Sequence, residues 1–195
     1  MLNELNSSLD LIIQQTLANR QILAIVIGIP WLVYLIDVLM KHRLLALGII
    51  PRKLCGLPGI FFAPFLHGDF NHLFFNTLPL LVLSDFILIQ GVNYFLTVTI
   101  LIGLISGFLI WLLGKPGIHI GASAIITGYW AFLVSSIYQE ATPIAIILGL
   151  LSLYYFAGIF FGIFPTRKGV SWEGHLLGLF AGIVTTLLLR HPLFY

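Results

Sequence analysis

Residues 71–113 read NHLFFNTLPLLVLSDFILIQGVNYFLTVTILIGLISGFLIWLL, and Asp85 is the only charged side chain among them. A helix that crosses the hydrocarbon core of a bilayer needs about 20 mostly apolar residues. The stretch is long enough for two such helices, which are expected at about 71–89 and 94–113. It therefore predicts two consecutive membrane-spanning helices joined by a short connection.

The other apolar runs of the chain follow the same pattern. Of its 195 residues, 59% are hydrophobic and only 8% are charged, whereas a soluble domain carries about a quarter charged residues. So little charge excludes an ordinary soluble protein, and a formal net charge of +2 does not indicate binding of nucleic acid. Four more spanning helices are expected, at about 21–40, 122–138, 143–164 and 174–190. We therefore predict an all-α polytopic membrane protein with six transmembrane helices in one domain, residues 1–195.

The connection between the first two helices, residues 41–68, is longer than the roughly 2–8 residues usual between helices. It combines basic side chains with many large apolar ones, among them Phe61, Phe62 and Phe65. This mixture is typical of a segment that lies at a membrane interface with its apolar side chains in lipid. The sequence therefore predicts a membrane-embedded first loop. Its Cys55 is the only cysteine of the chain, so no internal disulfide is possible.

Positive charge is unevenly divided between the two expected sides of the membrane. One side holds seven basic residues, and the other holds only Arg20 and Arg190. Because loops rich in Lys and Arg usually stay in the cytoplasm, this count alone places the side with seven basic residues there. The first twenty residues lack the basic start and the cleavage site of a signal peptide, so the first apolar run is expected to be a retained helix.

Two polar residues lie near the expected starts of helices. Ser123 follows the loop Lys115-Pro116-Gly117, and His175 lies in the stretch WEGHLLG, residues 172–178. Polar and ionisable side chains are costly in a bilayer, which makes them functional candidates. A serine beside a histidine can act as a nucleophile with its base. Taken singly, however, small residues in membrane helices more often mark close packing, and a lone histidine is more often an interfacial residue.

A second polar pair, His72 and Asn76, is four residues apart and therefore lies on one face of the second helix. The pair can stabilise the oxyanion that forms when a serine attacks a carbonyl, or it can hold two helices together. Near His175, the small residues Gly178 and Gly182 form a groove through which the sixth helix can approach the fourth. Helices two, four and six start on the same side, so all these polar groups are expected at similar depth.

These motifs together resemble those of the rhomboid intramembrane serine proteases in their bacterial six-helix form. The similarity covers four segments in this order: PFLHGD (64–69), HLFFN (72–76), HIGAS (119–123), and GHLLG (174–178) followed by Gly182. The resemblance implies an intramembrane serine endopeptidase with a catalytic dyad, in which Ser123 is the nucleophile and His175 is the general base. It also implies an oxyanion site formed by His72, Asn76 and the backbone N–H of Ser123.

The resemblance has further implications for the site and its surroundings. It implies supporting roles for His67, Gly121, Gly178 and Gly182, no metal or other cofactor, and transmembrane proteins as substrates. It places the chain in the cell membrane, the inner membrane of a bacterium, with cytoplasmic termini and a site that opens outward. This orientation is opposite to the one that the charge count indicates. The oligomeric state stays open.

Two residues depart from the family pattern. Ala124 stands where the family usually has glycine, and Thr127 stands where an aromatic residue often packs on the histidine. Tyr129 or Trp130 could take over that packing. The departures bear on rate and geometry more than on the type of reaction.

Other function classes remain open. A catalytically silent rhomboid-like protein would bind membrane segments without cutting them, and such relatives typically lack the serine or the histidine. A transporter or channel would need polar residues along a path through the bilayer, and only Asp37 and Asp85 offer them. A metalloprotease is disfavoured because no His-Glu-x-x-His motif occurs.

Overall fold

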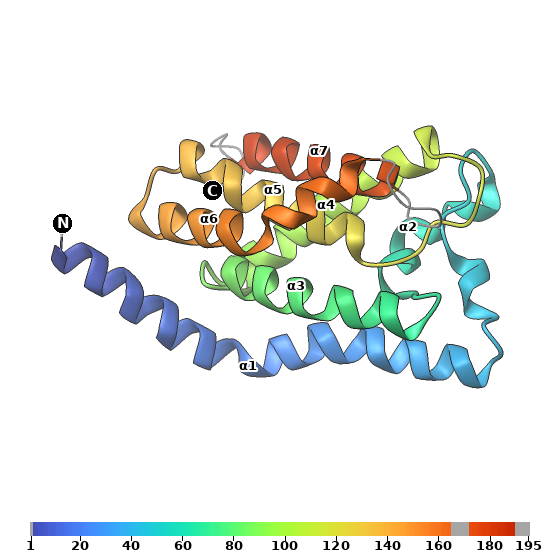
Figure 1. Ribbon diagram of the computed structural model, residues 1–195, viewed down its shortest axis with the longest axis horizontal. Coiled ribbons are helices and arrows are strands. Elements are labelled where there is room, and N and C mark those ends of the chain that lie inside the picture. The colour runs from blue at the N-terminus through green and yellow to red at the C-terminus, as the bar shows by residue number, and fades with distance from the viewer. Residues whose placement is uncertain (1, 165–171, 190–195) are drawn as a thin grey trace.

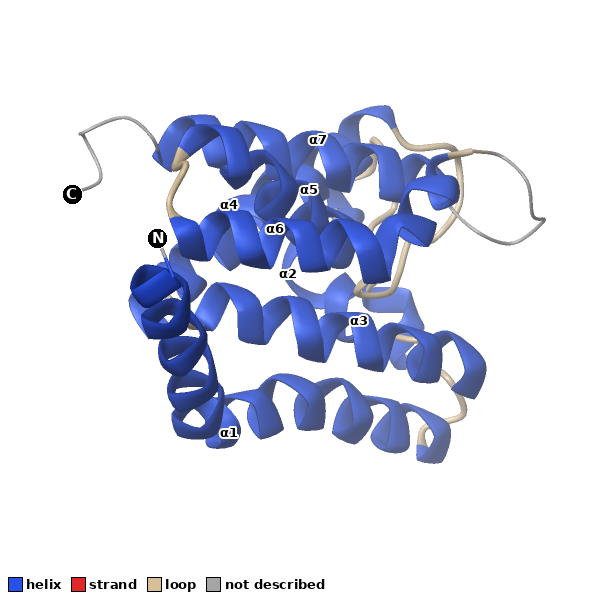
Figure 2. Cartoon of the chain, turned by 60° about the vertical axis from the view of Figure 1, so that its left-hand side comes forward, coloured by secondary structure: helices blue, strands red, loops and turns tan. Residues whose placement is uncertain are grey.

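The computed structural model describes residues 2–164 and 172–189, and most of them are helical. Figures 1 and 2 show the long helices packed side by side in one bundle. The α-helices of the described residues are α1 (Leu2–Leu39), α2 (Gly59–Phe62), α3 (Phe70–Leu88), α4 (Val92–Leu113), α5 (Ser123–Gln139), α6 (Pro143–Phe156) and α7 (Trp172–Leu189). The expected all-α fold is confirmed.

Four of these helices are long and apolar enough to cross a membrane, namely α1, α3, α4 and α7. α3 and α4 begin and end within two residues of the ranges expected from the apolar runs. α5 has 17 residues and α6 has 14, which makes them shorter than a typical span. The 3-10 helix η4 (Ala157–Ile163) continues α6, and the two together cover the run expected at 143–164.

The first helix is longer than expected, because α1 has 38 residues and starts at Leu2 rather than near residue 21. The additional segment mixes polar and apolar residues, so a search for apolar runs does not find it. Its polar side chains bind the end of α3: Thr16 Oγ1 donates to Asp85 Oδ2 at 2.7 Å, and Asn19 Nδ2 donates to the Leu88 carbonyl at 3.2 Å. α1 bends near its middle (Figures 1 and 2).

α5 lies at the centre of the bundle, in contact with α3, α4, α6 and α7. Its aromatic side chains Tyr129, Trp130 and Phe132 are buried, and the polar atoms of the first two find partners in neighbouring helices. The Tyr129 and Thr99 hydroxyls lie 2.6 Å apart, and Trp130 Nε1 donates to the Ser152 carbonyl at 3.1 Å. Because buried polar groups are costly without such partners, these bonds favour a single position for α5 and for Ser123, its first residue.

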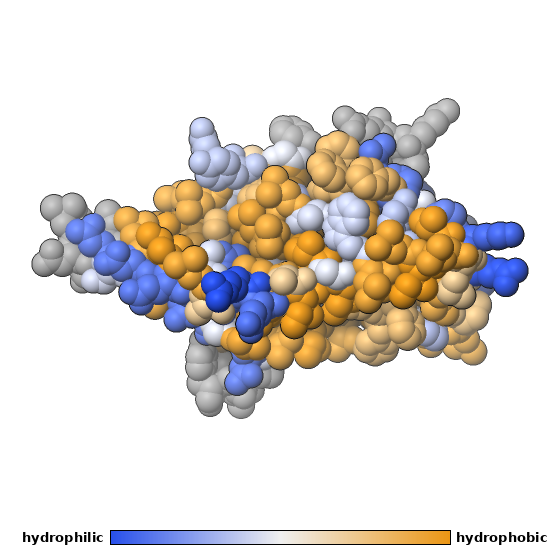
Figure 3. All heavy atoms as spheres, turned by 90° about the horizontal axis from the view of Figure 1, so that it is seen from below, coloured by the Kyte–Doolittle hydropathy of each residue, from blue (hydrophilic) through white to orange (hydrophobic). Residues whose placement is uncertain are grey.

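The face of the bundle that Figure 3 shows is largely apolar over its central part. Burying apolar surface away from water is worth about 25 cal/mol per Å², so a surface of this kind is unfavourable in water. Lipid tails are as apolar as these side chains and do not carry that cost. Examples with more than half of their surface exposed are Ile25, Leu32, Leu39, Phe75, Leu78, Ile100 and Leu113.

The first loop is built from short helical turns rather than irregular chain. In addition to α2 it contains the 3-10 helices η1 (Leu44–Leu47), η2 (Leu54–Gly56) and η3 (Ala63–Phe65). Leu54 is 79% exposed and Phe61 is 63% exposed, which supports the expectation that this loop contacts lipid.

Backbone hydrogen bonds join the first loop to the loop that precedes α5. Ile49 and His119 exchange two N–H to carbonyl bonds of 2.9 Å, and the Gly121 N–H donates to the Ala63 carbonyl at 2.9 Å. The first loop therefore supports the chain that leads into Ser123.

Candidate active site

Ser123 is the first residue of α5 and is half-buried. The N–H groups in the first turn of a helix have no partner within the helix. The N-cap residue, Ala122, has no side chain that could accept a hydrogen bond from them. Gly121 makes the turn into the helix with φ +105°, a conformation that L-residues with side chains rarely adopt. The serine hydroxyl and helix N–H groups suited to an anion thus lie at the same point.

His72 and Asn76 lie beside this turn. Asp69 caps α3 by accepting a hydrogen bond of 2.9 Å from the His72 N–H, which fixes the first turn of the helix. A Cβ atom added to Gly121 would lie 2.6 Å from His72 Nε2 and 3.7 Å from Asn76 Nδ2. Both side chains therefore face the residue that lies two positions before Ser123.

His67 lies behind this pair and is almost fully buried. Its Nε2 is 3.1 Å from Asn76 Nδ2, and its ring packs edge-on against His72 with centroids 5.0 Å apart. Burial, reinforced by the neighbouring His72, lowers the pKa of His67 from 6.5 to about 4. At neutral pH His67 is therefore an uncharged support for the two side chains in front of it.

We expect His67 to make the stability of the fold depend on pH. The native pKa of about 4 lies below the ordinary 6.5, so between these values the unfolded chain binds a proton that the native protein does not. The free energy of unfolding should therefore fall as pH decreases from about 6.5 toward 4, by up to about 1.4 kcal/mol per pH unit. Thermal melting in detergent at several pH values should show a steeper decline for the wild type than for His67→Gln. Parallel curves would contradict this expectation.

α5 and α7 pack closely through glycines. Gly178 lies against the Ala124 carbonyl and Thr127 Oγ1, and Gly182 lies against the Gly128 carbonyl. The two carbonyl contacts join residues 54 positions apart, as does the bond from Thr186 Oγ1 to the Phe132 carbonyl further along. Contacts that advance together along both helices mean that the helices run parallel and start at the same end. The first turn of α7 is therefore level with the chain around the start of α5.

His175 lies on this first turn of α7 and is half-buried. Its Nδ1 is 2.8 Å from the Gly162 carbonyl, and its ring is close enough to His72 for the two to interact electrostatically. Between the described residues Ser123 and His175, no side-chain hydrogen bond is formed. Such bonds are often long in the absence of substrate and shorten when it binds. Ser123 and His175 thus lie at the starts of two neighbouring helices, but they are not hydrogen-bonded to each other.

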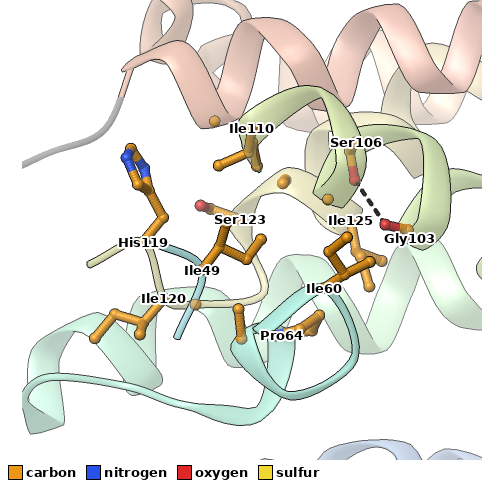
Figure 4. A pocket seen from close by; sticks show the side chains of 15 residues that line it. Ile49, Ile60, Pro64, Gly103, Ser106, Ile110, His119, Ile120, Ser123 and Ile125 are labelled. Carbon is orange, nitrogen blue, oxygen red and sulfur yellow. Dashed lines mark hydrogen bonds between the residues drawn. The ribbon is translucent and has the colours of Figure 1, made fainter. Parts of the chain in front are cut away.

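A small cavity of about 30 Å³ lies next to Ser123. Figure 4 shows the isoleucine side chains that line it, which come from the first loop, α4, α5 and the loop before α5. Ser106 also lines it, but its hydroxyl donates to the Ile102 carbonyl at 2.6 Å, within its own helix. The cavity is therefore mainly apolar and suits a small apolar group.

The comparison with known families agrees with this arrangement. The model of the Rhomboid domain matches residues 55–192, a range that includes Ser123 and His175 as well as His72 and Asn76. The chain belongs to the rhomboid family. Together with its apolar helices, this membership makes the rhomboid chain a multi-pass membrane protein.

Similar relatives of this rhomboid occur in mycobacteria. Uncharacterized proteins of Mycobacterium tuberculosis and Mycobacterium bovis are each 40% identical to it over 175 residues, which is 85% of this chain and 73% of the relative. An uncharacterized protein of Mycobacterium leprae is 38% identical over 173 residues, 83% of this chain and 68% of the relative.

The two departures from the rhomboid pattern have structural explanations. Thr127 is buried, and its Oγ1 donates to the carbonyls of Ser123 and Ala124 at 2.9 and 3.0 Å while contacting Gly178. Thr127 is therefore part of the packing contact between α5 and α7. The expectation that Tyr129 or Trp130 could pack on His175 is wrong, because both side chains bind partners in α4 and α6. The added methyl group of Ala124 lines the cavity beside Ser123.

Sequence reasoning missed two contacts at the start of α7. Lys115 Nζ lies 3.2 Å from Glu173 Oε1 and 4.9 Å from the centre of the Trp172 ring, which joins the loop before Ser123 to the helix that carries His175. The second contact is the bond from His175 to the Gly162 carbonyl. Neither partner lies in a motif, and a backbone carbonyl has no signal in the sequence.

Proposed function

We propose that this rhomboid is an intramembrane serine endopeptidase that uses Ser123 and His175 as a dyad. The observation that carries the proposal is the glycine-mediated parallel packing of α5 and α7, which places both residues at the same end of the bundle. The position of His72 and Asn76 beside the turn into Ser123 adds support, because an acyl-transfer site needs donors next to its nucleophile.

In this mechanism, Ser123 Oγ attacks the carbonyl carbon of a peptide bond while His175 Nε2 takes the hydroxyl proton. The resulting oxyanion is stabilised by His72, Asn76 and the Ser123 N–H. Loss of one such donor typically costs about 2.7–4 kcal/mol of transition-state stabilisation. His175 then donates the proton to the leaving amine, and water hydrolyses the acyl-enzyme with His175 again acting as base.

The proposed substrates are transmembrane segments of other proteins, which reach the site through the lipid bilayer. A helical segment hides its carbonyls in its own hydrogen bonds, so the substrate must unwind locally before Ser123 can attack. The apolar cavity beside Ser123 can take a small apolar side chain next to the cleaved bond.

We further propose that the protein lies in the cell membrane with cytoplasmic termini and a site that opens outward. Four of the seven basic residues that argue against this orientation lie in the first loop, whose backbone is bound to the rest of the bundle. A reporter fused after Tyr195 tests the orientation, and activity of an external reporter there contradicts it.

A fluorophosphonate probe separates an enzyme from a catalytically silent rhomboid that only binds membrane segments. The silent alternative is favoured by one observation, the lack of a hydrogen bond between Ser123 and His175. In that alternative Ser123 is inert and does not react with the probe. We expect the purified wild type to be labelled on Ser123 and the His175→Ala protein to lose at least about nine-tenths of that labelling, because the base activates the nucleophile. An unlabelled wild type would support the silent alternative, and equal labelling of the two proteins would contradict the dyad.

A further inference from the structure

His175, the proposed base, forms a hydrogen bond of 2.8 Å between its Nδ1 and the Gly162 carbonyl. Gly162 lies in η4 (Ala157–Ile163), between α6 and α7 in the chain. A carbonyl oxygen can only accept a hydrogen bond, so His175 must donate from Nδ1. A neutral imidazole has a single N–H, and its other nitrogen, Nε2, then carries the lone pair.

We propose that the Gly162 carbonyl is the positioning group that fixes the tautomer and the direction of the His175 ring. The proposal rests on the proposed function, since it assigns this group the task that a buried aspartate has in a Ser-His-Asp triad. The carboxylate nearest to His175 in sequence, that of Glu173, forms an ion pair with Lys115 at 3.2 Å instead. A backbone carbonyl thus takes the place of the acid, and it does so without placing a charge beside the membrane.

The absence of a side chain at Gly162 makes this contact possible. A Cβ atom added there would lie 2.5 Å from His175 Nδ1, closer than real Cβ atoms come to other atoms, and 3.0 Å from Cε1. The imidazole would have to turn or withdraw, and the hydrogen bond would be lost. Gly158 lies in the same 3-10 helix, and a Cβ atom added to it would meet nothing within 4 Å. Gly158→Ala is therefore a matched control for Gly162→Ala.

Histidine nitrogen NMR of the isotope-labelled full chain in detergent tests the tautomer directly. The signals of His175 are assigned by their loss in His175→Gln. We expect the wild type and Gly158→Ala to carry the proton on Nδ1, and Gly162→Ala to show an increased share of the Nε2–H form. This measurement does not depend on activity, so it stands even where the protein cleaves nothing. A wild-type His175 with its proton on Nε2 would overturn the proposal whether or not Gly162→Ala folds.

Cleavage kinetics with a reporter membrane segment test the consequence. We expect Gly162→Ala to lower kcat by about 100-fold with KM within about twofold of the wild type, because a misplaced base slows the chemical step and leaves substrate binding intact. Gly158→Ala should match the wild type in both constants, and melting curves verify that both variants are folded. A folded Gly162→Ala protein with the kcat of Gly158→Ala would overturn the proposal. Lack of cleavage by the wild type would instead contradict the proposed function.

Discussion

We expect the Ser123→Ala protein to cleave a reporter transmembrane segment at less than about a thousandth of the wild-type rate, because the reaction then has no nucleophile. Ser123 starts α5 at the point where His72 and Asn76 face Gly121. Water could still attack a bound substrate in this variant, and the oxyanion donors would still stabilise the transition state. The residual rate therefore measures the contribution of the rest of the site.

The measurement is cleavage by purified protein in detergent, followed by separation of the two fragments. Ser136→Ala is the matched control, since Ser136 lies on the same helix and its hydroxyl donates to the Phe132 carbonyl at 3.0 Å, away from the site. We expect this control to retain most of the wild-type activity. Equal cleavage by the wild type and Ser123→Ala would refute the assignment of the nucleophile and indicate a contaminating protease.

Much of the fold could be predicted from the sequence because hydropathy and turn residues act locally. α3 and α4 follow the apolar runs closely, since a helix must satisfy its own backbone hydrogen bonds in lipid. Likewise, α5 begins at Ser123, shortly after the Pro116-Gly117 turn that predicted a helix start there. The N-terminal part of α1 was missed because it mixes polar and apolar residues, and its polar contacts with Asp85 and Leu88 have no signal in a search for apolar runs.

The candidate site was predictable only as far as its motifs extend. Spacing placed His72 and Asn76 on one helix face and predicted a glycine groove on α7, and the packing of Gly178 against α5 agrees with that groove. The carbonyl that meets His175 and the lysine that meets Glu173 come from segments distant in sequence. Such contacts depend on how loops lie in three dimensions, and one sequence holds no spacing rule for them.

The close packing of α5 and α7 predicts a large effect of a single methyl group. A Cβ atom on residue 178 would overlap the Ala124 carbonyl and Thr127 Oγ1. A backbone carbonyl within a helix cannot turn aside, so the two helices would have to separate. Such overpacking typically costs about 1–3 kcal/mol. We expect Gly178→Ala to lower the melting temperature by about 2–12 °C, the range that this cost implies for a chain of this size.

The same separation should also lower activity, because it moves His175 away from Ser123. A misplacement of about 1 Å at a reacting group can cost about 100-fold in rate. Gly28→Ala is the matched control: Gly28 also lies within a helix, and a Cβ atom there would meet nothing within 4 Å. Both substitutions gain helix propensity, by up to about 1 kcal/mol, so only the contact with α5 distinguishes them. If Gly178→Ala melts and cleaves like Gly28→Ala, the glycine contact does not set the distance between the proposed nucleophile and its base.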